Sequence, residues 1–167
     1  MTNKFRISAI ALSLGFQFGC QDGLDDPSSL PALDEAYFRC HVQPVLVKSC
    51  GAFACHGDGR RYFRVFGRNR LRAQGAERER HSLLTSDAFQ YNFDSARAIV
   101  DREAPPASPL LLKPLEQRAG GSYHRGADIF GMGNVFLSRE ERDFKTLDAW
   151  VHGAKEDPAC KEPGVNQ

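Results

Sequence analysis

The pattern of apolar and polar positions predicts a helix near residue 34. Residues 33–42, "LDEAYFRCHV", carry apolar side chains at helical offsets, and Asp34 and Glu35 suit the N-terminus of a helix. The apolar members are Ala36, Phe38 or Tyr37, and Val42. We expect Pro44 to kink this helix or to restart it before "VLVKSC".

A second helix is predicted close to the C-terminus. Ser138 and Glu141 have the spacing of a capping box, and Gly153 is a suitable end. The apolar face comprises Phe144, Leu147 and Val151, with Trp150 beside them. Pro and Lys residues follow, so that a short tail over residues 161–167 is expected after the folded region.

The middle of the chain predicts little regular structure. Residues 57–81 are strongly basic and interrupted by glycine, which indicates an irregular surface segment. Residues 95–101, "SARAIVD", predict one short helix, and "EAPPASP" predicts a loop before "LLLKPL". Residues 119–134 contain five glycines. Long loops of this kind within compact domains are usually functional.

The first residues have the pattern of an export signal. Lys4 and Arg6 precede the apolar run "ISAIALSLGFQF", and Gly19 and Cys20 follow it. The apolar run is too short to span a bilayer. It resembles a bacterial lipoprotein signal over residues 1–19, which implies lipidation of Cys20. Simple secretion and a buried N-terminal helix are the alternatives. Residues 20–33 predict a flexible tether, and residues 34–160 one domain.

Composition restricts the function further. The 167 residues carry a formal net charge of +1, with 41% hydrophobic and 26% charged residues. This balance does not suggest a nucleic-acid binder. Export implies an oxidising compartment, in which free thiols tend to be oxidised or modified.

The most informative motif is "CGAFACH", residues 50–56. A histidine directly after the second of two cysteines is the pattern of covalent haem attachment, although the usual spacer has two residues and this one has four. Small residues in the spacer would let it bulge outward at low cost. A direct Cys50–Cys55 disulfide loop is one alternative. A zinc site is another, with ligands drawn from Cys40, His41, Cys50, Cys55 and His56.

Several blocks in order resemble a planctomycete-type cytochrome c domain. They are "VQPVLVKSCGAFACHGDG" (42–59), "SPLLLKPL" (108–115), "GGSYHRGADIF" (120–130) and "DFKTLDAWVHGA" (143–154). The resemblance covers roughly residues 36–154. It implies a mainly α, small cytochrome c-like fold, with N- and C-terminal helices packed together and long loops around one haem c.

The resemblance also assigns the candidate site. It implies that Cys50 and Cys55 form the haem thioethers and that His56 is the proximal iron ligand. His124 matches the distal histidine, and Met132 in the same loop is its rival. His56 and His124 are therefore the expected metal ligands.

The remaining cysteines suit one disulfide. Cys40 and Cys160 flank the terminal helices, which the resemblance implies pack together, so we expect them to be bonded. A cluster of arginines between residues 60 and 72 suits a solvated face, contact with an acidic redox partner or anionic head groups, or one or two contacts to haem propionates.

We therefore expect a lipid-anchored, monohaem electron carrier facing the periplasm or cell surface. It has no enzymatic activity of its own, and its partners are an unidentified redox protein and the membrane that holds its anchor. The alternative is a non-catalytic, disulfide-stabilised lipoprotein that acts as a binding module without haem.

Overall fold

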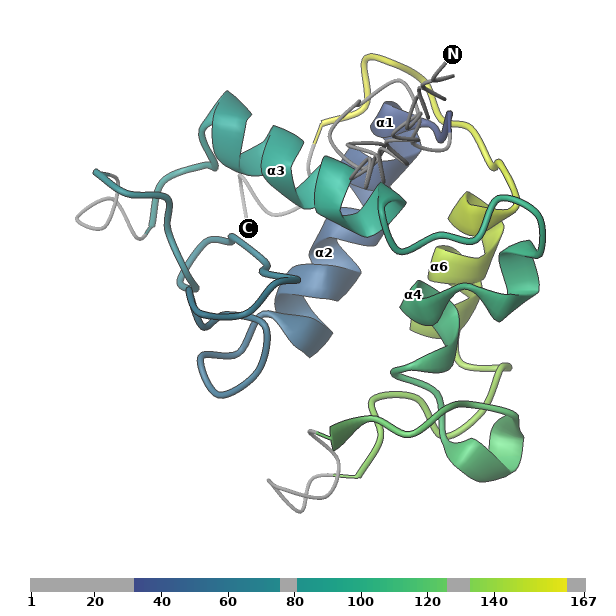
Figure 1. The fold of residues 1–167 in the computed structure, drawn as a ribbon. Helices are drawn as coiled ribbons and strands as arrows, with labels where there is room; N and C mark the ends of the chain where they lie inside the picture. Colours follow the sequence, from purple (N-terminus) through teal and green to yellow (C-terminus); the bar gives the residue numbers. More distant parts are fainter. Residues whose placement is uncertain (1–31, 76–80, 126–132, 162–167) are drawn as a thin grey trace, which may run out of the picture.

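The protein is mainly helical in a computed structural model that describes residues 32–75, 81–125 and 133–161 (Figure 1). The predicted signal, Cys20 and nearly all of the tether lie outside these residues, as do Met132 and residues 162–167. Across the described ranges, extended pairing is limited to two isolated bridges, Phe66 with Leu71 and Leu115 with Phe136. No helix in these ranges is both long enough and apolar enough to cross a membrane.

The first helical stretch is continuous from residue 35 to residue 50. It consists of α1 (Glu35–Tyr37), a π-helical segment (Phe38–Val42), α2 (Gln43–Val45) and a second π-helical segment (Leu46–Cys50). The Asp34 carboxylate caps its start by accepting a 2.6 Å hydrogen bond from the Tyr37 amide, and the helix begins near residue 34 as predicted.

Pro44, which was expected to kink or restart the helix, stands in the first turn of α2, and the helical stretch continues through it. Proline cannot donate a backbone hydrogen bond, and the helix instead uses wider turns on both sides. The Gln43 amide donates to the Phe38 carbonyl, and the Gly51 amide donates to the Leu46 carbonyl at 2.9 Å. The wider turns carry the helix past Pro44, and Cys50 is its last residue.

The other helices are α3 (Ser86–Arg97), α4 (Pro109–Leu112) and α6 (Arg142–Val151), with short 3-10 turns at Pro105–Ala107 and Gln117–Ala119. The predicted helix at residues 95–101 was wrong, because α3 begins nine residues earlier and ends at Arg97. Thr85 caps α3 by accepting a hydrogen bond from the Ala88 amide at 3.3 Å.

The first and last helices pack together, as the sequence analysis expected. Trp150 in α6 is fully buried, and its indole N–H donates a 2.8 Å hydrogen bond to the Asp34 carbonyl. Its ring lies 5.1 Å from the Phe38 ring, centre to centre. Lys48 and Asp143 form an ion pair at 2.9 Å between the same helices. The predicted apolar faces of both helices are therefore part of the core.

The predicted capping box lies before α6 rather than in its first turn, whereas the predicted end of the helix is confirmed. The Glu141 carboxylate accepts hydrogen bonds from the Leu137 and Ser138 amides, and α6 itself starts at Arg142. At the other end, Gly153 has a φ of +88° and its amide bonds to the Trp150 carbonyl at 2.9 Å. This left-handed glycine ends the helix where the sequence predicted.

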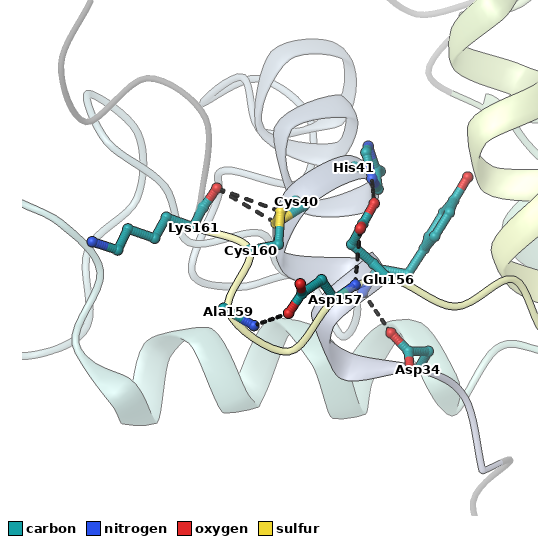
Figure 2. The surroundings of a disulfide bond; sticks show 9 residues. Asp34, Cys40, His41, Glu156, Asp157, Ala159, Cys160 and Lys161 are labelled. Atoms are coloured by element: carbon teal, nitrogen blue, oxygen red, sulfur yellow. Dashed lines mark hydrogen bonds and ion pairs between the residues drawn. A yellow bond between two sulfur atoms is a disulfide. The ribbon is translucent and has the colours of Figure 1, made fainter.

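The Cys40–Cys160 disulfide is present, which confirms the expected pairing (Figure 2). The two Cα atoms are 6.2 Å apart, and Cys40 is buried. Beside the disulfide, Nε2 of His41 lies 2.7 Å from Oε2 of Glu156. The chain after α6 is thus attached to the first helix at two neighbouring points.

Candidate functional site

The "CGAFACH" motif begins where the first helical stretch ends. The Cys55 and Gly57 amides both donate to the Ala52 carbonyl, at 2.8 and 2.9 Å, and the His56 amide donates to the Cys50 carbonyl at 3.0 Å. Ala52, Phe53 and Ala54 are exposed. The spacer therefore bulges outward, and the loop closes so that His56 lies against the start of the motif.

Gly57 permits this closure. A Cβ atom at this position would lie 2.3 Å from the Gly51 carbonyl oxygen, a distance that requires the backbone to shift. The close approach at Gly57 is therefore between this residue, which directly follows the motif, and the backbone of Gly51 and Ala52.

Cys50 and Cys55 are free thiols and are partly buried, so the structure does not contain the alternative disulfide loop. Burial, followed by the neighbouring Cys55, raises the pKa of Cys50 to about 12. Cys50 is therefore a protonated thiol at neutral pH rather than a reactive thiolate.

The zinc alternative is not supported. Cys40 is committed to the disulfide with Cys160, and His41 faces Glu156. In the part of the chain that the structure describes, no three His, Cys, Asp or Glu side chains are grouped as a metal site.

The environment of His56 determines which ring nitrogen is available to a ligand. Its Nδ1 lies 2.8 Å from the Phe63 carbonyl oxygen. A carbonyl only accepts, so Nδ1 carries the proton and Nε2 is left with its lone pair. Burial, with a smaller effect from Arg61, lowers the pKa of His56 against the opposing effect of the Phe63 hydrogen bond. The ring is therefore neutral at pH 7 and able to bind a metal.

His124 is carried by a different loop, which follows α4. The Ser122 amide donates to the Leu112 carbonyl at 2.8 Å, and Lys113 Nζ donates to the Tyr123 carbonyl at 3.0 Å. Gly121 allows the tight turn, since a Cβ there would lie 1.9 Å from the Leu115 carbonyl oxygen.

The same loop is attached to the segment that precedes α6. The Glu116 amide donates to the Phe136 carbonyl at 2.8 Å, and the Phe136 amide donates to the Pro114 carbonyl at 2.9 Å. Leu115 and Phe136 are both buried. His124 is therefore presented by a loop with a buried anchor.

The structure brings His56 and His124 together from loops 68 residues apart in the chain. Their ring centres are 6.0 Å apart, and the ring planes differ by only 11°. Burial lowers the pKa of His124, and smaller effects of His56 and Lys113 act in the same direction. The site therefore pairs two neutral, nearly parallel imidazoles, one of which directly follows the free thiol Cys55 in the chain.

The other histidines of the described residues have different roles. His152 follows α6, and its Nδ1 lies 2.8 Å from the Asp148 carbonyl oxygen. His81 is exposed. These observations agree with surface or structural roles for both residues.

The arginines between residues 60 and 72 have several local partners. Arg60 pairs with Asp58 at 2.8 Å, and Arg64 donates to the Tyr91 hydroxyl at 2.9 Å. Arg72 is buried and donates to the carbonyls of Ser82 and Leu83. The stretch is therefore not a uniform solvated face, because its side chains also hold the loop to α3 and to the segment before it.

The residues that support His56 were not predicted from the sequence. Buried Asn92 in α3 accepts from the Phe66 amide at 2.9 Å and donates to the Phe66 carbonyl at 2.7 Å. It also donates to Gln43 Oε1 at 3.1 Å. This network fixes the segment that presents the Phe63 carbonyl to His56. The only signal in the sequence was an amide residue within an apolar helical face.

No family model, curated protein or solved structure matches the chain.

Proposed function

We propose that the protein is a single-haem, c-type cytochrome-like electron carrier. The observation that carries the proposal is the pairing of the His56 and His124 ring centres at 6.0 Å, with His56 in the motif that contains the free thiols Cys50 and Cys55. A first-row metal bonded to two imidazole nitrogens at about 2.0–2.1 Å separates the ring centres by roughly 6 Å. The spacing of the two rings suits a shared metal better than direct contact between them.

The residues present fit a covalently held haem. Cys50 and Cys55 supply the two thiols for thioether bonds, and His56 follows Cys55 directly. The hydrogen bond from His56 to Phe63 leaves Nε2 as the ligand atom, as is usual for histidines that bind metals. A bound haem would supply one-electron redox chemistry.

His124 is the distal ligand in this proposal. It is neutral, its ring is nearly parallel to that of His56, and its loop is anchored by buried residues. Met132, the rival, lies outside the described residues. The chain's own residues therefore hold and orient the group, and no substrate pocket or catalytic role is proposed.

Export and lipid anchoring through Cys20 belong to the same proposal. A disulfide between Cys40 and Cys160 is typical of proteins that fold outside the reducing cytoplasm. The lipoprotein-like signal would place the domain on a membrane facing the periplasm or cell surface, where it exchanges electrons with a partner protein.

The test is covalent attachment in protein produced with a haem maturation system. The denatured protein is extracted with acidic organic solvent and stained for haem on a gel. We expect stain that resists extraction in wild type and in Cys40→Ala/Cys160→Ala, and none in Cys50→Ser/Cys55→Ser. Absence of stain in wild type refutes the proposal and favours the disulfide-stabilised binding module.

A further inference from the structure

We infer that the two loops carrying His56 and His124 form a docking surface for a protein partner with an acidic surface. The choice of a protein partner rests on the proposed electron-transfer function, since lipids do not accept electrons. The contacts that recognise the partner belong to this chain and do not depend on haem.

Charge is distributed unevenly between these loops and the rest of the protein. Residues 57–75 and 113–125 contain nine Lys or Arg and two Asp or Glu, a formal charge of +7. The other described residues contain nine Lys or Arg and twelve Asp or Glu, a formal charge of −3. A net charge of +1 for the whole chain conceals this separation.

We use the name basic face for the exposed cations of the two loops, which the contact of His56 with His124 brings together. Its members are Arg60, Arg61, Arg68, Lys113, Arg118 and Arg125. Arg61 lowers the pKa of His56 after the larger effect of burial, and Lys113 acts similarly on His124. Positive charge from both loops therefore reaches the histidine pair.

Exposed aromatic side chains lie on the same loops or on the bulge that precedes the first of them. Tyr62 is fully exposed, and Phe53 and Tyr123 are each 57% exposed. Phe53 belongs to the bulge before Cys55, Tyr62 precedes the residue that binds His56, and Tyr123 precedes His124. Tyrosine and arginine are enriched among residues that dominate binding energy at protein interfaces.

In Figure 1, residues 113–125 lie at the end of the molecule away from α1, whereas residues 57–75 lie beside α2 and run up toward α3. The opposite end carries the disulfide and the acidic residues Asp34, Glu156 and Asp157 (Figure 2). The excess of positive charge on the two loops steers an acidic partner toward the histidine pair that they carry. Complementary charge favours a partner whose own surface is rich in Asp and Glu.

The experiment measures binding of the full chain to immobilised poly-glutamate and to a glutamate–tyrosine copolymer over a series of salt concentrations. We expect salt-dependent binding to both polymers, and tighter binding to the copolymer. Arg61→Glu should weaken binding roughly fivefold or more at low salt, since one close charge pair in water is worth about 1 kcal/mol. Lys155→Glu, the matched control outside the basic face, should change binding less than twofold.

Tyr62→Ser should remove most of the preference for the copolymer without changing binding to poly-glutamate. Equal effects of Arg61→Glu and Lys155→Glu would overturn the inference, because net charge alone would then explain binding. Binding to phosphatidylglycerol vesicles without binding to either polymer would overturn it in favour of a membrane surface. Binding to none of these would overturn it as well.

Haem staining of the same preparations separates this inference from the proposed function. If the protein carries haem but fails to bind the polymers, the proposed function stands and the docking surface is refuted. If the protein binds the polymers with the expected variant effects but carries no haem, the docking surface stands and the proposed function is refuted.

Discussion

Removing the Cys40–Cys160 disulfide should lower the free energy of unfolding by about 5 kcal/mol, as an upper figure from the chain-entropy model. The bond closes a loop with a sequence separation of 120 residues, so it restricts nearly the whole denatured domain. The folded state keeps the hydrogen bond between Trp150 and Asp34 and the packing of Trp150 on Phe38. We therefore expect Cys40→Ala/Cys160→Ala to fold with unchanged helix content but much lower stability.

Urea unfolding of haem-free protein, followed by circular dichroism, measures this loss. The dependence of the unfolding free energy on urea should become steeper, because the denatured chain exposes more surface without the crosslink. Cys50→Ala/Cys55→Ala is the control, since it removes two thiols and no crosslink. A loss below about 1 kcal/mol with unchanged urea dependence would refute the argument that the bond acts on the denatured state.

Three further outcomes follow from local geometry and from the sequence. Gly57→Ala should destabilise the domain by roughly 2–3 kcal/mol because its Cβ would lie 2.3 Å from a backbone carbonyl oxygen, whereas Gly59→Ala, whose nearest neighbour is a side-chain atom at 4.0 Å, should stay within about 0.5 kcal/mol in thermal melts. The hydrogen bond from His41, followed by a backbone hydrogen bond, lowers the pKa of Glu156 below its ordinary 4.5. The stabilisation from the His41–Glu156 hydrogen bond is therefore complete above pH 4.5 and is lost as pH falls through the lowered pKa of Glu156. Hydrogen exchange of the residues after α6 should accelerate in that pH range. Glu156→Gln should remove this pH dependence. Mass spectrometry of the mature protein should find a lipidated N-terminal Cys20, and a mature N-terminus at another residue would contradict the predicted anchor.

The terminal helices could be predicted because their packing follows from local patterns. Ala36, Phe38 and Val42 in the first helix, and Phe144, Leu147 and Trp150 in the last, are all buried. These residues repeat at the helical period, and capping or terminating residues stand at the ends. The pairing of Cys40 with Cys160 then followed from the expected packing of the two helices.

The middle helix was predicted poorly because its buried face is not uniformly apolar. Asn92 occupies a core position in α3, where it replaces a missing backbone partner of Phe66. The burial of Asn92 depends on the loop that contains Phe66, which is distant in sequence, so no local pattern indicates that Asn92 is buried. The helix likewise passes through Pro44 with wider turns on both sides, which no local pattern in the sequence indicates.

The residues of the candidate site could be predicted from the sequence, but the contacts that orient them could not. The position of His56 after Cys55 is a local signal, and His124 stands in a glycine-rich loop of the matching block. The Phe63 carbonyl determines which nitrogen of His56 carries the proton. Because it is a backbone group, the type of residue at position 63 does not reveal this role. Only the folded chain shows that the two rings are nearly parallel.

The ferric absorption spectrum of haem-loaded protein tests the central claim most directly. If His56 and His124 both bind the iron, the spectrum should be low-spin and should lack the weak long-wavelength band of methionine ligation. His124→Ala should then become high-spin, while Met132→Ala should remain low-spin. A high-spin spectrum in Met132→Ala, together with an unchanged spectrum in His124→Ala, would contradict the account and assign the distal position to Met132.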